Sequence, residues 1–278
     1  MTYKTILVHC DAAKNVGHRL GVAAELAERH SAHLVGFHAR QPFEAPVFFD
    51  GGFPMDNLYK SYEASAKADQ ETAAVAFEAA IKGRHLSTEW RVVDGFADSE
   101  LVVQARYADL LVLGQADPES SLPTPADLPE AVALASGRPV LVVPHIGVTT
   151  APGKTVLLCW NASREAARAA SEALPVLKAA AKVIVLVIDA KSSLAGHGAE
   201  PGADAATWLA RHGVKVTVQR DTAADDDVGA TILSRAADHA VDLIVMGLYG
   251  HSRLREMVLG GASRTLLGSM TVPVLMAH

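Results

Sequence analysis

The fold of this chain is decided by the stretch Asp242-Leu-Ile-Val-Met-Gly247-Leu-Tyr-Gly250-His-Ser-Arg-Leu-Arg-Glu-Met-Val-Leu-Gly260-Gly261-Ala-Ser263. Its short apolar run ends abruptly at Gly247, which is typical of a strand buried in a parallel sheet. Glycines after such a strand let backbone N–H groups approach a bulky anion, because no Cβ blocks the way. The small residues up to Ser263 open a predicted helix over 262–269, whose unpaired first N–H groups attract anions.

Positive charge surrounds this glycine-rich loop. His251, Arg253, Arg255 and Arg264 lie in or beside it, although the formal net charge of the 278 residues is -6. Two glycines alone would favour a plain strand-to-helix connection. The whole spacing, Gly-x2-Gly-x9-Gly followed by small residues, favours a phosphate site instead.

Three segments of the first half return in the second half, in the same order. The pairs are Lys4-Thr-Ile-Leu-Val-His-Cys-Asp11 with Lys154-Thr-Val-Leu-Leu-Cys-Trp-Asn161, Ala108-Asp109-Leu-Leu-Val-Leu-Gly114 with Val241-Asp242-Leu-Ile-Val-Met-Gly247, and Arg138-Pro-Val-Leu-Val-Val143 with Val272-Pro-Val-Leu-Met-Ala277. The shared order indicates a duplication. We therefore expect two domains, residues 1–147 and 148–278, joined by a short linker of loop residues.

Strands alternate with helices in both expected domains. The expected strands are 4–10, 33–39, 88–94, 109–113, 139–143, 154–159, 182–188, 214–219, 242–246 and 272–276; the expected helices are 15–30, 56–83, 97–107, 127–136, 163–179, 203–212, 227–239 and 262–269. This alternation predicts an α/β fold of two tandem Rossmann-like, doubly wound domains, each a five-stranded parallel sheet of order 3-2-1-4-5 flanked by helices. Such sheets bind ligands where strands one and four end, which in the second domain is at Asn161 and Gly247.

The glycine spacing resembles that of the ATP-binding universal stress proteins, and the chain is identified as a tandem, two-domain member of that family. In strand pattern the resemblance spans both halves, whereas the binding motif lies within residues 154–278. The resemblance implies a single ATP with Mg2+ in the second domain. It also implies a role as a nucleotide-dependent sensor or regulator in the stress response.

The resemblance assigns the nucleotide site to Cys159, Asn161, Val187, Met246, Gly247, Gly250, His251, Arg253, Gly260, Gly261, Ala262 and Ser263. Two of these positions depart from the family pattern. Asn161 stands where the family usually has Asp, which removes a charge that would help to hold a metal ion. Gly261 stands where Ser or Thr is usual, so a hydroxyl contact would have to come from Ser263. For Val187 and Met246, simple core packing is the alternative interpretation.

The first domain has acidic residues where the second has motif glycines. Asp117 and Asp127 align with Gly250 and Gly260 to within a residue. Each puts a Cβ and a negative charge where a phosphate would lie, and the nearby prolines remove backbone donors. We therefore expect the first domain not to bind a nucleotide in this way, and to be a scaffold or a pocket for something else.

Composition argues against several other classes of protein. Acidic residues outnumber Lys and Arg by 31 to 25, which argues against a nucleic-acid binder. The longest apolar stretch, 179–190, is too short to span a membrane, and no signal peptide is recognisable, so a cytoplasmic location is expected. The two cysteines lack metal-ligand spacing and are expected to be free thiols.

No catalytic motif is recognisable, so enzymatic activity stays open, and at most slow, incidental ATP hydrolysis is expected. An alternative hypothesis is a nucleotide-free interaction module that binds a client protein or a small non-nucleotide ligand. A weaker one is a hydrolase or transferase of the wider adenine-nucleotide fold.

The resemblance also implies contacts between domains. Family members pair domains through their last strands, so 140–143 and 272–276 are candidates to pair within the chain as a pseudo-dimer, and two chains are candidates to form a homodimer. Four of the seven phenylalanines lie within 41–55, and this segment is expected to pack on the other domain, a partner subunit or a ligand.

Overall fold

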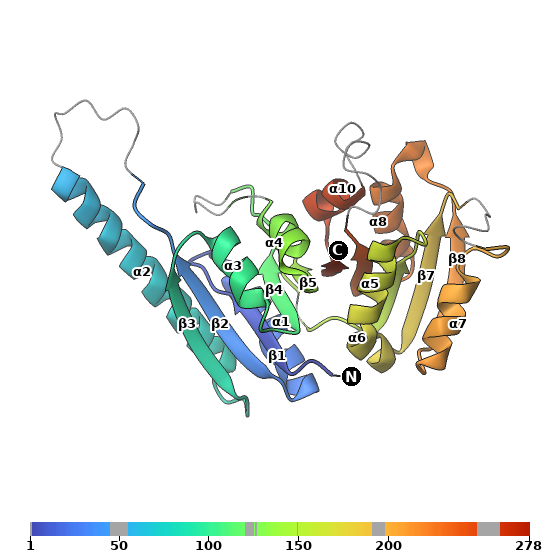
Figure 1. The fold of residues 1–278 in the computed structure, drawn as a ribbon, viewed down its shortest axis with the longest axis horizontal. Coiled ribbons are helices and arrows are strands. Elements are labelled where there is room, and N and C mark those ends of the chain that lie inside the picture. Colours follow the sequence, from blue (N-terminus) through green and yellow to red (C-terminus); the bar gives the residue numbers. More distant parts are fainter. Residues whose placement is uncertain are drawn as a thin grey trace.

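The computed structural model describes residues 2–44, 55–119, 125, 127–148, 150–190, 198–248 and 262–278 (Figure 1). The first half contains β1 (Thr5–His9), α1 (Val16–His30), β2 (His33–Arg40), α2 (Met55–Ile81), β3 (Thr88–Asp94), α3 (Ala97–Ala105), β4 (Leu110–Gly114), α4 (Leu128–Ser136) and β5 (Val140–Val143). The second half contains β6 (Thr155–Cys159), α5 (Arg164–Glu172), α6 (Leu174–Ala179), β7 (Lys182–Ile188), α7 (Ala203–Arg211), β8 (Val216–Asp221), the short η1 (Ala224–Asp226), α8 (Val228–Asp238), β9 (Leu243–Gly247), α10 (Ala262–Ser269) and β10 (Val274–Ala277).

The strands form one ten-stranded sheet in the order β3-β2-β1-β4-β5-β10-β9-β6-β7-β8. Within each half every pairing is parallel, and the strand order of each half is 3-2-1-4-5. This confirms the predicted α/β fold of two tandem Rossmann-like halves. The halves meet where β5 pairs antiparallel with β10, with Val142 opposite Val274 and Leu141 opposite Leu275. The last strands of the two halves therefore pair within the chain, as expected.

Helices cover both faces of this sheet. Helices α1, α2, α5, α6 and α7 pack on one face, with buried apolar side chains such as Leu20 of α1 and Phe77 of α2. Helices α3, α4, α8 and α10 pack on the other face, with buried side chains such as Leu101 of α3 and Leu266 of α10. Successive strand residues point to opposite faces, so strands buried on both faces are almost wholly apolar. None of the helices in the described part of the chain is long and apolar enough to cross a membrane.

The expected helix over 163–179 was wrong in one respect, because the structure divides it into α5 and α6 at Ala173. Pro175 lies in the first turn of α6, and a proline has no N–H to continue the hydrogen bonding of a preceding helix. The expected strand over 214–219 is displaced as well and runs from Val216 to Asp221.

The segment before α2 is described only in part. Phe43 packs against Tyr59 and Tyr62 of α2, with ring centroids 5.7 Å and 5.4 Å away. The other phenylalanines of the expected packing segment lie within 45–54, outside the described residues.

Asp109 and Asp242 occupy equivalent positions in the two repeats, and each joins the fourth strand of its half to the first. The Asp109 carboxylate accepts hydrogen bonds from the backbone N–H groups of Lys4 and Thr5, at 2.6 Å and 3.0 Å. Asp242 does the same for Lys154 and Thr155, both at 3.0 Å, and also accepts from Gly153 N at 3.2 Å. In each half, the residue before the fourth strand therefore fixes the start of the first strand.

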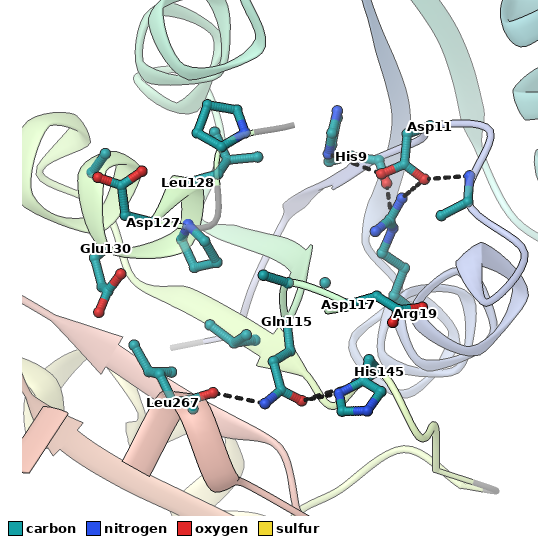
Figure 2. Close-up of a pocket in the computed structure, with 18 of the residues that line it drawn as sticks. His9, Asp11, Arg19, Gln115, Asp117, Asp127, Leu128, Glu130, His145 and Leu267 are labelled. Carbon is teal, nitrogen blue, oxygen red and sulfur yellow. Dashed lines mark hydrogen bonds and ion pairs between the residues drawn. The ribbon is translucent and has the colours of Figure 1, made fainter. Parts of the chain in front are cut away.

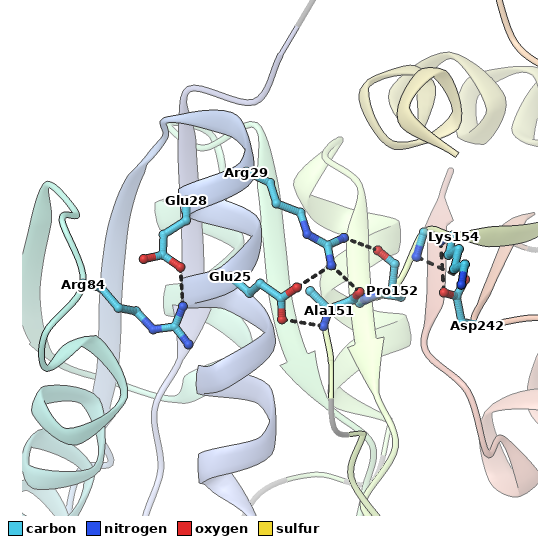
Figure 3. A network of polar contacts seen from close by, with 9 residues as sticks. Glu25, Glu28, Arg29, Arg84, Ala151, Pro152, Lys154 and Asp242 are labelled. Atoms are coloured by element: carbon cyan, nitrogen blue, oxygen red, sulfur yellow. Dashed lines mark hydrogen bonds and ion pairs between the residues drawn. The ribbon is translucent and has the colours of Figure 1, made fainter. Parts of the chain in front are cut away.

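The linker between the halves is held from its other side by α1 (Figure 3). Arg29 donates hydrogen bonds to the carbonyls of Pro152, at 3.0 Å, and Ala151, at 2.8 Å. Glu25 forms an ion pair with Arg29 and accepts from Ala151 N at 2.8 Å. The linker therefore lies in a fixed path from α1 of the first half to Asp242 of the second.

Replacing Asp242 by alanine should lower the free energy of unfolding by about 2–3 kcal/mol, because three backbone N–H groups lose a charged acceptor. Asp242→Asn should lose less, since the amide oxygen still accepts. Asp238→Ala is the matched control: its carboxylate pairs with Arg235 at the surface, so the cost should stay below about 1 kcal/mol. Urea unfolding checks this, and equal losses in Asp242→Ala and Asp238→Ala would contradict it.

Candidate functional site

The carboxyl ends of three adjacent parallel strands meet at one edge of the C-terminal half. The strands are β7, β6 and β9, in that order. This edge brings together Cys159 at the end of β6, Val187 near the end of β7, and Met246 with Gly247 at the end of β9. It is the edge at which doubly wound sheets bind their ligands.

The connection from β6 to α5 is a tight turn fixed by its own side chains. Asn161 Oδ1 accepts from Ser163 N at 3.2 Å, and Ser163 Oγ accepts from Ala166 N at 3.1 Å and so caps α5. Between them, Ala162 has a left-handed φ of 58°. Asn161 lacks the negative charge of a carboxylate, so it is a weaker ligand for a metal ion than Asp would be.

Gly247 has a packing role independent of any ligand. A Cβ at this position would lie 2.5 Å from both the amide nitrogen of Ala166 and the carbonyl carbon of Glu165. The first turn of α5 therefore packs directly on the end of β9, which requires the absence of a side chain.

The side chains of Val187 and Met246 lie in the core on opposite faces of the sheet, 1% and 6% exposed. Val187 lies one residue beyond Leu186, which is opposite Cys159 in the last pair of residues between β6 and β7. Both side chains therefore serve core packing, and these residues can contribute to a site at this edge only through their backbone.

Both cysteines are free. Burial raises the pKa of the Cys159 thiol to about 12 and is also the main cause that raises the pKa of Cys10 to about 12. Both thiols are therefore protonated at neutral pH, and neither is an activated nucleophile.

The remaining residues of the expected nucleotide site belong to the loop after β9 and to α10. Ala262 and Ser263 form the first turn of α10, where Ser263 is buried and Ala262 is half-buried. The carbonyl of Ala262 would lie 2.9 Å from a Cβ at Gly229, so the start of α10 packs closely on α8. Gly250, His251, Arg253, Gly260 and Gly261 lie outside the described residues.

A cavity of about 830 Å³ lies at the corresponding edge of the N-terminal half (Figure 2). The ends of β1 and β4 form its floor, and the start of α4 forms one wall. The C-terminal half contributes Arg264, Leu267 and Gly268 of α10. The acidic residues that replace the motif glycines, Asp117 and Asp127, both line this cavity.

A buried arginine sits beneath the cavity, where the C-terminal half has an alanine. Arg19 is 6% exposed, donates from Nε to the carbonyl of His9 at 2.8 Å, and forms an ion pair with Asp11. Its Nη1 occupies the space that a Cβ on Gly114 would need. Burial alone would raise the pKa of Asp11. The charge of Arg19 and several smaller contributions together outweigh this effect, so the pKa of Asp11 is lowered.

His9 is a neutral histidine beside this ion pair. The residue is 3% exposed, and burial lowers its pKa to about 4, with Asp11 opposing the shift and Arg19 adding to it. Its Nδ1 lies 4.0 Å from Asp11 Oδ2, beyond hydrogen-bond distance.

Gln115 joins the two halves at the cavity. Its Nε2 donates to the carbonyl of Leu267 in α10 at 2.7 Å. Its Oε1 accepts from the backbone N–H of His145 at 3.0 Å and lies 3.0 Å from Nδ1 of the same residue. The wall that α10 contributes is therefore hydrogen-bonded to the N-terminal half.

Comparison with known proteins decides the family of the C-terminal half. Residues 153–278 match the sequence model described as the Universal stress protein family. This half of the chain belongs to the universal stress protein family. A curated relative, Universal stress protein Slr1230 of Synechocystis, is 45% identical over 38 residues. That match covers 14% of this chain and 13% of the relative, so the chain spans only a small part of the relative's length.

Solved structures show the same fold over the whole chain. A universal stress protein from Archaeoglobus fulgidus aligns with a TM-score of 0.71 and 17% identity, covering 98% of this chain and 95% of its own. A functionally unknown protein from Pseudomonas aeruginosa PAO1 aligns with a TM-score of 0.56 and 14% identity, covering 99% and 92%. The N-terminal half therefore shares the universal stress protein fold.

The cavity also contains five residues that were not predicted from the sequence: Arg19, His9, Gln115, Glu130 and His145. A signal was present for Arg19, which interrupts the apolar stripe of α1 between Val16 and Leu20 and aligns with Ala169 in the second repeat. No comparable signal existed for Gln115, because its partner in α10 is 152 residues away.

Gly247→Ala should destabilise the protein by about 1–3 kcal/mol even without nucleotide, since the added Cβ forces α5 away from β9. Gly17→Ala in α1 is the control, because nothing lies within 4 Å of its added Cβ, and it should stabilise by about 0.5–1 kcal/mol. Thermal unfolding of the two variants distinguishes these effects. Unchanged stability of Gly247→Ala would show that Gly247 has no such packing role.

His9 should make the protein less stable in mild acid. Its pKa is lower in the folded than in the unfolded chain, so protons bind preferentially to the unfolded state as the pH falls below about 6.5. Between pH 7.5 and 5.0 this amounts to about 2 kcal/mol lost. Urea unfolding of His9→Gln should lack this component, whereas His85→Gln, an exposed control, should keep it. The same pH dependence in His9→Gln and the wild type would contradict the assignment.

Proposed function

We propose that this chain is a stress-response protein that binds a single ATP at the carboxyl edge of its C-terminal half and acts as a nucleotide-dependent sensor or regulator. The observation that carries this proposal is the match of residues 153–278 to the universal stress protein family. The convergence of β6, β7 and β9 at one edge supports it. Ala262 and Ser263, at the start of α10, add a helix N-terminus to which phosphate is attracted.

The described residues fit a nucleotide whose metal is carried by its own phosphates. No group of three His, Cys, Asp or Glu side chains suited to a metal occurs within the described part of the chain. Asn161 is uncharged and its oxygen is engaged with Ser163. We therefore propose that Mg2+ enters with ATP on the phosphate oxygens, as is usual for this ion.

We further propose that the pairing of β5 with β10 takes the place of a homodimer contact, so that one chain acts as a pseudo-dimer. The free thiols of Cys10 and Cys159 support a reducing, cytoplasmic location. The net charge of -6 disfavours nucleic acid as a partner. A client protein that reads the nucleotide state completes this proposal.

A second candidate function is an interaction module whose ligand is not a nucleotide. The cavity of the N-terminal half favours it, because Asp117 and Asp127 line that cavity in place of motif glycines. The two functions are compatible, since the proposed nucleotide edge and the cavity lie at the ends of different strands.

Calorimetric titration of ATP, with and without Mg2+, tests the proposed nucleotide site. The wild type should bind a single ATP per chain, and Gly250→Asp, which copies the N-terminal repeat, should weaken binding by about tenfold or more through charge repulsion. Ser171→Asp adds the same charge at an exposed position near the far end of α5 and should bind normally.

Two ATP molecules per chain would contradict the assignment to the C-terminal half alone. Equal weakening in Gly250→Asp and Ser171→Asp would show a general charge effect instead of a local site. If no binding is measured, and no nucleotide is released on denaturing the purified protein, the interaction module becomes the better account.

A further inference from the structure

The cavity of the N-terminal half stands at the ligand position of a doubly wound sheet but lacks the features of a phosphate site. Arg19 is engaged with Asp11 and His9. Pro129, in the first turn of α4, has no N–H to offer, and Asp127 at the N-cap adds a negative charge there. An anionic ligand is therefore disfavoured.

The charge of the lining points the same way. Four carboxylates, from Asp11, Asp117, Asp127 and Glu130, face two guanidiniums, from Arg19 and Arg264. Counting only these carboxylates and guanidiniums, the lining carries a net charge of -2. Burial and the neighbouring Asp127 raise the pKa of Glu130, and Arg264 only partly offsets this. Among the described residues, Arg264 therefore supplies only part of a counter-charge for Glu130.

The hydrogen-bonding groups of the lining are unequally used. Three of its donor side chains are engaged inside the protein: Arg19 with His9 and Asp11, Asn15 with the carbonyl of His145, and Gln115 with the carbonyl of Leu267. In contrast, the Asp127 side chain makes no capping hydrogen bond at the start of α4. Two of the acidic side chains are engaged as well, since Asp11 accepts from Ala13 N at 3.0 Å and Asp117 accepts from Glu119 N at 2.9 Å. Among the described residues, the carboxylates left without a hydrogen bond are those of Asp127 and Glu130, and a ligand for them must bring donors.

His9 is an independent indication of a ligand. Only 4% of its side chain is exposed, and it lines the cavity. Its imidazole makes no hydrogen bond with any other residue that the structure describes, and its nearest charged partner, Asp11, is 4.0 Å away. A neutral imidazole nitrogen in this position is an acceptor for a donor that enters the cavity.

The acidic residues and His9 lie in two groups on different sides of the cavity. Figure 2 shows Asp127 and Glu130 on one side of the cavity and His9 and Asp11 on the other. The lining also includes the apolar side chains of Leu134 and Val142. A ligand that matches this arrangement has a cationic donor at each end and a hydrocarbon chain between them.

We propose that the cavity binds an aliphatic di- or polyamine. One ammonium group is held by Asp127 and Glu130, the other lies near His9 and Asp11, and the alkyl chain follows the apolar wall. This site is separate from the proposed nucleotide site, and its occupation requires no nucleotide.

Calorimetric titration with 1,4-diaminobutane and spermidine, in nucleotide-free protein at physiological salt, tests the proposal. Saturable binding at a single site per chain is expected, and 1,4-butanediol, which lacks the charges, should not bind. The isosteric double variant Asp127→Asn with Glu130→Gln should weaken amine binding by about tenfold or more. Arg264→Gln, which removes a competing cation, should strengthen it.

The matched control is Glu71→Gln with Glu78→Gln, which removes two charges from exposed positions of α2, remote from the cavity. Its amine affinity should equal that of the wild type, and the melting temperatures of both double variants establish that they fold. Equal weakening in the two double variants would overturn the proposal in favour of general charge attraction. Absence of saturable amine binding, or competition for the site by inorganic phosphate, would overturn it as well.

Discussion

Three residue pairs between β5 and β10 join the two halves of this protein into one sheet. Each of these strands would otherwise be the edge of a five-stranded sheet, with unpaired N–H and C=O groups open to any other strand. Their antiparallel pairing removes both edges at once and leaves only β3 and β8 at the borders of the sheet. The side chains of β5 and β10 are fully buried, so the junction is part of the core.

This junction also determines what surrounds each ligand edge. Because β10 runs antiparallel to β5, the residues that precede β10 lie next to the carboxyl end of β5. The last turn of α10, with Leu267 and Gly268, therefore becomes a wall of the N-terminal cavity. Neither half could form this cavity alone, since the floor comes from one repeat and a wall from the other.

The sequence was sufficient to predict most strands and their order, because these depend on short apolar runs and on repetition, whereas the pairing of the halves followed from the resemblance to the family. Asp109 and Asp242 even marked equivalent structural positions. The features that escaped prediction depend on contacts between distant segments. Gln115 meets Leu267 only after the junction has formed, and the need for glycine at Gly247 arises from the approach of α5. The nucleotide site stays a prediction, and its loop from Gly250 to Gly261 lies outside the described residues.

The two repeats keep the same fold although the residues at the carboxyl edges of their strands differ. The fold requires apolar strands, the Asp that fixes the first strand, and close packing at Gly114 and Gly247. At Gly114 the close neighbour is the guanidinium of Arg19, whereas at Gly247 it is the backbone of α5.

A single helix touches both edges. α10 has only eight residues; it starts against α8, near the carboxyl edge of the C-terminal half, and its last turn is hydrogen-bonded to Gln115. A helix this short moves as one rigid piece, because its own hydrogen bonds link each turn to the next. Any displacement at its start must therefore strain the 2.7 Å bond from Gln115 or shift the cavity wall with it. The geometry of the cavity and the position of the predicted phosphate-binding turn are thus not independent in this protein.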